Sequence, residues 1–70
     1  MRVNQERLTA SLSKIGGEKP TYVEPRNDGF VAFFASELAA LRVAYHYRLK
    51  VVTCAHRRAL GVWSVAVKNL

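Results

Sequence analysis

The chain carries one cysteine and two histidines, and Cys54 and His56 lie two residues apart in a segment whose pattern predicts a strand. Residues at this spacing share a face of a strand. The pair therefore suggests two hypotheses, a metal site and a reactive thiol. A zinc site needs further ligands, usually in pairs such as CxxC, and His46 is the only other histidine. Same-face neighbours lie about 7 Å apart, beyond hydrogen-bond reach for a nucleophile and its base. We therefore expect no metal, no cofactor and no catalytic role for Cys54.

Acid–base cleavage of RNA is the more serious enzymatic alternative. It requires a histidine, or a Glu/His pair, and an arginine that holds the phosphate. The chain supplies these residue types in His46, His56, Arg57 and Arg58, and small ribonuclease toxins have a comparable size, but no spacing identifies that class. The segment IGGEKP lacks the GxxxxGK[ST] pattern of a phosphate-binding loop. The sequence thus favours a binding protein over an enzyme. A ribonuclease is the third hypothesis, after the two kinds of binding protein described below.

Charge is distributed unevenly along the chain. The net charge is +6, yet residues 1–37 contain five basic side chains and all five acidic ones, so the whole surplus lies in residues 38–70, which contain no acid. Such asymmetry is typical of a surface for nucleic acid, an acidic protein or anionic lipid, although small domains also carry net charge for solubility. The residues expected to bind nucleic acid or an acidic partner are Arg42, His46, Arg48, Lys50, Arg57, Arg58 and Lys68.

The segment CAHRRALGVWSVAVKN predicts two strands joined by a basic turn, with Arg57 and Arg58 at its tip. A two-stranded ribbon with a basic tip can enter a groove of nucleic acid, and arginine suits phosphates and guanine edges. Aromatic rings can stack on bases. Among the aromatic side chains of this half of the chain, we expect Tyr47 to be exposed and Trp63 to lie in the core. The favoured function is non-enzymatic regulation on nucleic acid or its machinery, transcription above all.

A protein-only regulator is the competing hypothesis. The same arginines would then dock on an acidic surface of a larger protein, because arginine and tyrosine are typical interface residues. A stripe on the N-terminal helix could also dock in a groove. The candidate docking residues are Leu8, Leu12, Ile15 and Tyr47.

In size and charge the chain resembles the short host-directed regulators that phages encode, including those that dock on bacterial RNA polymerase. The resemblance covers the whole chain but no residue motif, so it implies a class of function and no site residues.

The first element expected is a helix over residues 4–15, with Asn4 as N-cap and Gly16-Gly17 as its end. Leu8, Leu12 and Ile15 form a narrow apolar stripe on it. A helix of this length is marginal alone, so it must dock or fray. We treat residues 1–17 as a helical segment and 18–70 as the compact core of one domain.

Residues 30–35 fit two interpretations. As a helix, they would extend the following helix upstream to an Asp28 N-cap. As a strand, they would form a hairpin with TYVE across the turn PRNDG, and Ser36 would cap the helix; the turn chemistry and the aromatic content favour the strand. Residues 37–48 are helical, with Leu38, Leu41 and Tyr45 on one face and Val43 and Tyr47 on the back.

Strands are expected over 49–57 and 61–70, with Trp63, Val65 and Val67 on one face. In the first of these strands either Leu49 and Val51 or Val52 and Cys54 point inward. The fold class is therefore α+β in the order α-β-β-α-β-β, a small antiparallel sheet packed on one helix with a C-terminal hairpin.

No stretch reaches the ~20 clean apolar residues of a membrane span, and residues 1–14 lack the apolar region of a signal peptide. We expect a cytoplasmic protein, a monomer or homodimer, with no membrane among its partners.

Overall fold

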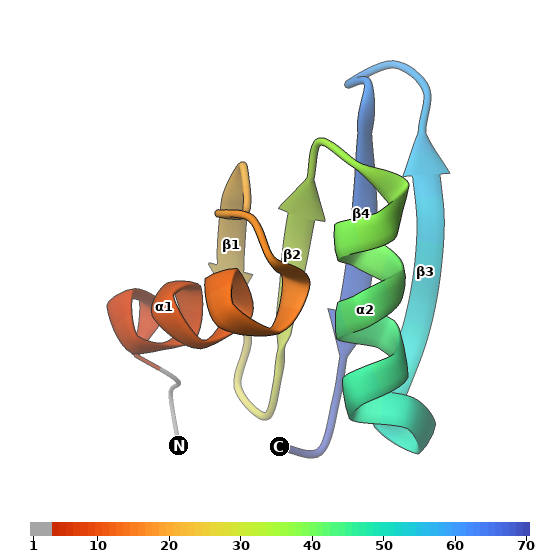
Figure 1. Cartoon of the computed structure of the whole chain (residues 1–70). Helices are drawn as coiled ribbons and strands as arrows, with labels where there is room; N and C mark the ends of the chain where they lie inside the picture. Colours follow the sequence, from red (N-terminus) through yellow and green to blue (C-terminus); the bar gives the residue numbers. More distant parts are fainter. Residues whose placement is uncertain (1–3) are drawn as a thin grey trace.

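In the computed structural model, which describes residues 4–70, two helices lie on one face of a four-stranded antiparallel sheet (Figure 1). The elements are α1 (Gln5–Gly16), β1 (Tyr22–Pro25), β2 (Phe30–Phe34), α2 (Glu37–Tyr47), the short 3-10 helix η1 (Arg48–Lys50), β3 (Val51–Arg57) and β4 (Val62–Val67). The sheet order is β1-β2-β4-β3, so β1 and β3 form its edges. The predicted α+β class and element order are confirmed. None of the helices in residues 4–70 is long and apolar enough to cross a membrane.

Local chemistry sets both ends of α1. The Asn4 side chain accepts a hydrogen bond from the backbone N–H of Arg7 at 3.0 Å, as expected of an N-cap. Gly17 closes the helix in the left-handed conformation, with φ of 81°. Leu8 and Leu12 are buried in the main core, so α1 docks on the sheet and on α2. The first three residues of the predicted N-terminal segment lie outside the described residues.

Residues 30–34 form a strand, as the turn chemistry predicted. β2 pairs with β1 on one side and with β4 on the other, which makes it a central strand. Its burial alternates, with Phe30, Ala32 and Phe34 at 0% exposure facing the helices. Gly29 precedes it for a reason that the sequence did not reveal: its φ is not positive, but a Cβ there would overlap the Val67 carbonyl oxygen.

The orientation of α2 about its own axis differs from the sequence expectation. Ser36 caps the helix by accepting a hydrogen bond from the Ala39 N–H at 3.2 Å, as predicted. The buried face, however, consists of Ala39, Ala40 and Val43, which are at most 1% exposed. Phenylalanines of β2 already fill the space beneath the helix, so only small side chains fit on the side that faces the sheet. The prediction that Val43 lies on the back of the helix is therefore wrong.

Neither of the two registers proposed for β3 describes it completely. The strand begins at Val51, because residues 48–50 form η1 and Leu49 is fully exposed. A bulge between Val51 and Thr53 adds one residue to β3, and such an extra residue shifts the alternation of faces. As a result Val51 and Cys54 both pack against the core, whereas Val52 is 62% exposed. On β4, Trp63, Val65 and Val67 share the core side, as predicted.

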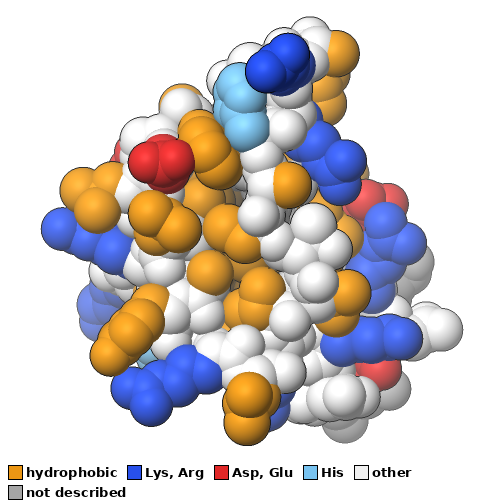
Figure 2. All heavy atoms as spheres, turned by 90° about the vertical axis from the view of Figure 1, so that its right-hand side faces the viewer, with side chains coloured by type: hydrophobic (Ala, Val, Ile, Leu, Met, Phe, Trp, Pro, Cys, Tyr) orange, Lys and Arg blue, Asp and Glu red, His pale blue; other side chains and the backbone are white. Residues whose placement is uncertain are grey.

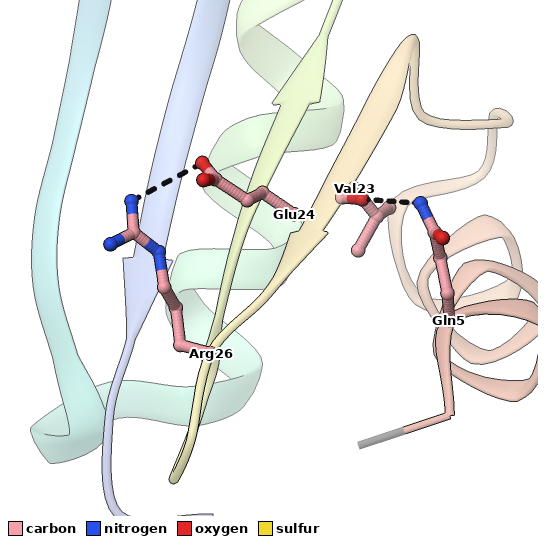
Figure 3. A network of polar contacts seen from close by, with 4 residues as sticks. All are labelled: Gln5, Val23, Glu24 and Arg26. Atoms are coloured by element: carbon pink, nitrogen blue, oxygen red, sulfur yellow. Dashed lines mark hydrogen bonds and ion pairs between the residues drawn. The ribbon is translucent and has the colours of Figure 1, made fainter. Parts of the chain in front are cut away.

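The two edges of the sheet are protected differently. β1 is short and ends in a proline, and the Gln5 side chain of α1 donates a hydrogen bond to the Val23 carbonyl at 2.7 Å, from the side away from β2 (Figure 3). Proline and a covering element both block pairing with another strand. β3 has seven residues, no proline, and no described element along its outer edge.

The close approach at Gly29 yields a test of the fold. We expect Gly29→Ala to lower the free energy of unfolding by about 1–3 kcal/mol, because the new methyl group forces the end of β4 to move. Gly61→Ala is the control: its Cβ meets nothing within 4 Å, so only its positive φ adds a cost of about 1 kcal/mol. Urea unfolding of both variants measures the difference. A larger loss at Gly61 than at Gly29 would contradict this account of the turn.

Candidate binding surface

The seven predicted basic side chains are all exposed, but the structure divides them between separate regions. Figure 2, which views the molecule toward the β3 edge, shows Lys and Arg at the top, on the right and at the lower left, around apolar and uncharged atoms, with a few acidic groups at the margin. The structure therefore does not form the single constellation that the sequence suggested. Arg42 and His46 lie on α2 beside Ile15 of α1, and the Arg42 guanidinium lies close to Gly17. One basic group lies at η1 and directly after β4 and consists of Arg48, Lys50 and Lys68. The other group lies at the β3–β4 hairpin.

The short helix η1 places the residues of the first group near the start of β3. The Lys68 backbone N–H donates to the Lys50 carbonyl at 2.9 Å, which ties the end of β4 to the start of β3. Arg48 has φ of 48° and ψ of −111°, a conformation that a non-glycine residue rarely adopts. Its guanidinium lies 5.0 Å from the centre of the Tyr45 ring, within the range of a cation–π contact. A strained residue thus turns the chain sharply and keeps its charge at the surface.

His56 and Arg57, adjacent at the end of β3, point to opposite sides of the sheet. His56 lies against Trp63, with ring centres 4.9 Å apart, on the side of the sheet that carries the helices. Arg57 folds back over the opposite side, where its Nε donates to Ser64 Oγ at 3.0 Å. Arg58 begins the turn itself. Both arginines therefore lie at the hairpin, as predicted, but the Arg57 guanidinium is bound to Ser64 over the sheet and does not extend from the tip.

The outer face of α2 is a surface that the sequence analysis missed. Leu38, Leu41 and Tyr45 are 58%, 49% and 72% exposed. Leu41 and Tyr45, with Ile15 of α1 and the basic residues Arg42 and His46, line a shallow hollow of about 480 Å³. We call Leu38, Leu41 and Tyr45 the outer stripe of α2; Leu49, also exposed, follows in η1. The signal that could have revealed it is the run of small residues beside it, because a helix packed closely on phenylalanines must turn its small face inward.

The candidate docking residues fall into three environments. Leu8 and Leu12 are 6% and 0% exposed and belong to the core, so they offer no stripe for a partner. Tyr47, expected to be the exposed ring, is partly buried and packs edge-on against Phe30 at 5.4 Å between ring centres. Ile15 is partly buried and borders the hollow beside α2. Tyr45, two residues before the predicted position and so on nearly the opposite side of the helix, is the exposed tyrosine of α2.

The two histidines are not brought together, whereas Cys54 and His56 share the face of β3 that carries the helices. His46 lies at the C-terminal end of α2 against Tyr47, whereas His56 lies near the hairpin, toward the other end of the sheet (Figure 1). No group of three potential metal ligands occurs within residues 4–70. Burial raises the pKa of the Cys54 thiol, and the nearby Glu37 carboxylate raises it further. A thiol with a raised pKa stays protonated at neutral pH and is a poor nucleophile.

These groups predict a loss of stability at alkaline pH. The pKa of Cys54 and, through burial, that of Tyr47 are raised in the folded state. Their contribution is complete below the unfolded pKa values of about 8.5 and about 10, and it is lost as the pH rises through the folded ones. The free energy of unfolding, measured with urea from neutral to alkaline pH, should therefore fall with pH. Cys54→Ala and Tyr47→Phe should each flatten that fall, and an unchanged slope in both would contradict the assignment.

Over residues 4–70, the surface therefore combines separated basic groups, an apolar helix face and a sheet face that no described element covers (Figure 1). No family model matches the chain, and no curated protein or solved structure is significantly similar to it.

Proposed function

We propose that this protein is a small, non-enzymatic, cytoplasmic regulator that binds nucleic acid, with transcription as the process it regulates. One observation carries the proposal. Each of the six Lys and Arg side chains of residues 38–70 is exposed, and none forms an ion pair with another described residue. The ion pair that residues 4–70 do form joins Arg26 to Glu24, in the other half of the chain.

Free positive charge of this kind favours a polyanion. Each phosphate neutralised by a Lys or Arg releases condensed counterions, which supplies most of the affinity of non-specific binding. The two basic groups lie at opposite ends of β3, whose seven residues span about 20 Å at about 3.3 Å per residue. Groups so separated can contact phosphates at two places along a nucleic acid. Phosphate contacts fix position and carry no sequence information, so the proposed binding has little sequence preference.

The proposal predicts that binding weakens with salt, and that the salt dependence comes from the basic residues of residues 38–70. In fluorescence anisotropy with labelled duplex DNA and single-stranded RNA, affinity should fall steeply from low to near-physiological salt. The double variant Arg48→Gln, Lys50→Gln should reduce the slope of log affinity against log salt by about one unit per lost phosphate contact. The matched control Arg7→Gln, Lys19→Gln removes the same charge from exposed positions of the other half, and its slope should stay unchanged.

Two outcomes would argue against this function. Equal changes in slope for both double variants would mean that only the net charge matters. Absence of binding even at low salt would remove nucleic acid as the partner. The same samples test the ribonuclease alternative, because a non-enzymatic protein leaves the RNA intact on a gel after prolonged incubation.

A protein partner is the second candidate function, and the outer stripe of α2 favours it. A contiguous apolar face rimmed by basic groups is typical of protein interfaces. Here the chain would inhibit or redirect a larger enzyme such as RNA polymerase by docking on an acidic surface. The hollow between Ile15 and α2 would then receive an apolar side chain of that enzyme, beside Arg42 and His46.

This candidate predicts a position-specific contact in cells. A photoreactive amino acid at Leu41, which is 49% exposed, should give one crosslinked adduct of constant mass. The same amino acid at Ala10, an exposed position of α1, should not give that adduct. Identical adducts from both positions, or none from Leu41, would exclude the outer stripe as the docking surface.

A further inference from the structure

The face of the sheet opposite the helices is uncovered within the described part of the chain (Figure 1). Strand registers align Tyr22 with Phe33, Phe33 with Ser64, and Ser64 with Ala55, so one row crosses all four strands. The neighbouring row of Val23, Ala32 and Val65 is at most 2% exposed and faces the helices. Because side chains alternate along a strand, the row from Tyr22 to Ala55 lies on the open face.

Planar groups dominate this row. The Tyr22 side chain is 55% exposed, and its ring centre lies 6.3 Å from that of Phe33, with the ring planes 31° apart. Next in the row, Ser64 is only 1% exposed because Arg57 lies over it. The Ser64 hydroxyl accepts from Arg57 Nε and donates to the Ala55 carbonyl at 3.4 Å. This chain of bonds fixes the guanidinium over the sheet and leaves its two terminal nitrogens unbonded among the described residues.

A shallow hollow of about 450 Å³ adjoins the aromatic pair. It is lined by Thr21, Tyr22, Glu24, Phe33, Leu60 and Val62. Its volume falls within the roughly 300–1,000 Å³ of sites that bind small ligands. Glu24 is its acidic group, and the Arg26 guanidinium neutralises that carboxylate at 3.2 Å (Figure 3). The hollow therefore offers an aromatic wall without an unpaired negative charge.

We propose that the open face binds the unpaired bases of a single-stranded nucleic acid, an inference that rests on the proposed function. Bases stack on aromatic rings and on guanidinium planes, and the row presents two rings and one guanidinium side by side. Arg58, one residue further on, reaches the phosphates from the hairpin. The exposed cations favour an anion, and the exposed rings favour a ligand that carries flat apolar groups. A duplex does not fit, because its bases are stacked inside and its grooves admit a helix or a two-stranded ribbon, not a flat sheet.

The test compares two exposed tyrosines on opposite sides of the molecule. Labelled single-stranded RNA and duplex DNA of equal length are titrated by anisotropy at low and near-physiological salt. Single strands should bind more tightly than the duplex. Tyr22→Leu should weaken single-strand binding by roughly tenfold without changing the salt slope, because the ring carries no charge. Tyr45→Leu makes the same change on the outer stripe of α2, at a side chain 72% exposed. It removes the ring beside Arg48 but no charge, so it should weaken single-strand binding much less than Tyr22→Leu.

Phe33→Leu provides a second variant on the same row and should weaken single-strand binding in the same way; thermal unfolding confirms that each variant is folded. Preference for the duplex, or wild-type affinity in both row variants, would overturn the inference and leave nucleic-acid binding itself intact. A loss with Tyr45→Leu alone would move the site to α2. Absence of binding to every oligonucleotide at low salt would overturn the proposed function together with this inference.

Discussion

Phe34 lies where the two helices meet the sheet, and its packing limits what each of them can place there. It is completely buried on β2 and pairs in register with Trp63 of β4. A Cβ on Gly16, at the end of α1, would come within 3.3 Å of its ring and within 3.4 Å of the Ala39 carbonyl of α2. Both helices therefore present small residues to this point, since protein interiors leave no room for additional atoms.

The exposed apolar surfaces follow from this packing. Because α2 turns alanines and Val43 toward the phenylalanines, its larger side chains Leu38 and Leu41 must face outward. Both helices of residues 4–70 lie in one layer (Figure 1), and a chain of this size buries only about 60% of the surface exposed on unfolding. The second face of the sheet, with Tyr22 at 55% exposure, consequently stays uncovered. Exposed aromatic and aliphatic groups on both sides are a geometric result of the two-layer fold, and they are also the surfaces available to a partner.

Topology determines how charge is presented on these surfaces. Residues 38–70, which contain no acid, form α2 after Glu37, η1, β3 and β4. Their cations other than Arg42 lie near the two ends of the edge strand β3. β3 then separates them, with Lys50 before its first residue and Arg58 after its last. Arg57 differs from the others because Ser64 anchors its guanidinium over the open face. Charge on flexible surface groups attracts a polyanion from any direction, whereas an anchored guanidinium restricts how the polyanion is oriented.

The sequence by itself determined the features that depend on neighbouring residues. Asn4 and Ser36 cap their helices, Gly17 ends α1, and residues 30–34 form a strand, because capping and turn chemistry act within a few residues. The surplus of charge in residues 38–70 was equally visible. Sequence periodicity could not show which side of α2 is buried, since apolar residues occupy nearly all of that helix.

Only the tertiary structure decided the remaining features. The choice between Tyr45 and Tyr47 as the exposed ring depends on the phenylalanines beneath α2. The faces of β3 depend on a bulge, and the alignment of Tyr22 with Phe33 and Ser64 depends on pairing between strands distant in sequence. Glycine at position 29 is required by the carbonyl of Val67, 38 residues further along the chain. The physical reason is common to all of them: each depends on the volume or register of a partner that only folding brings into contact.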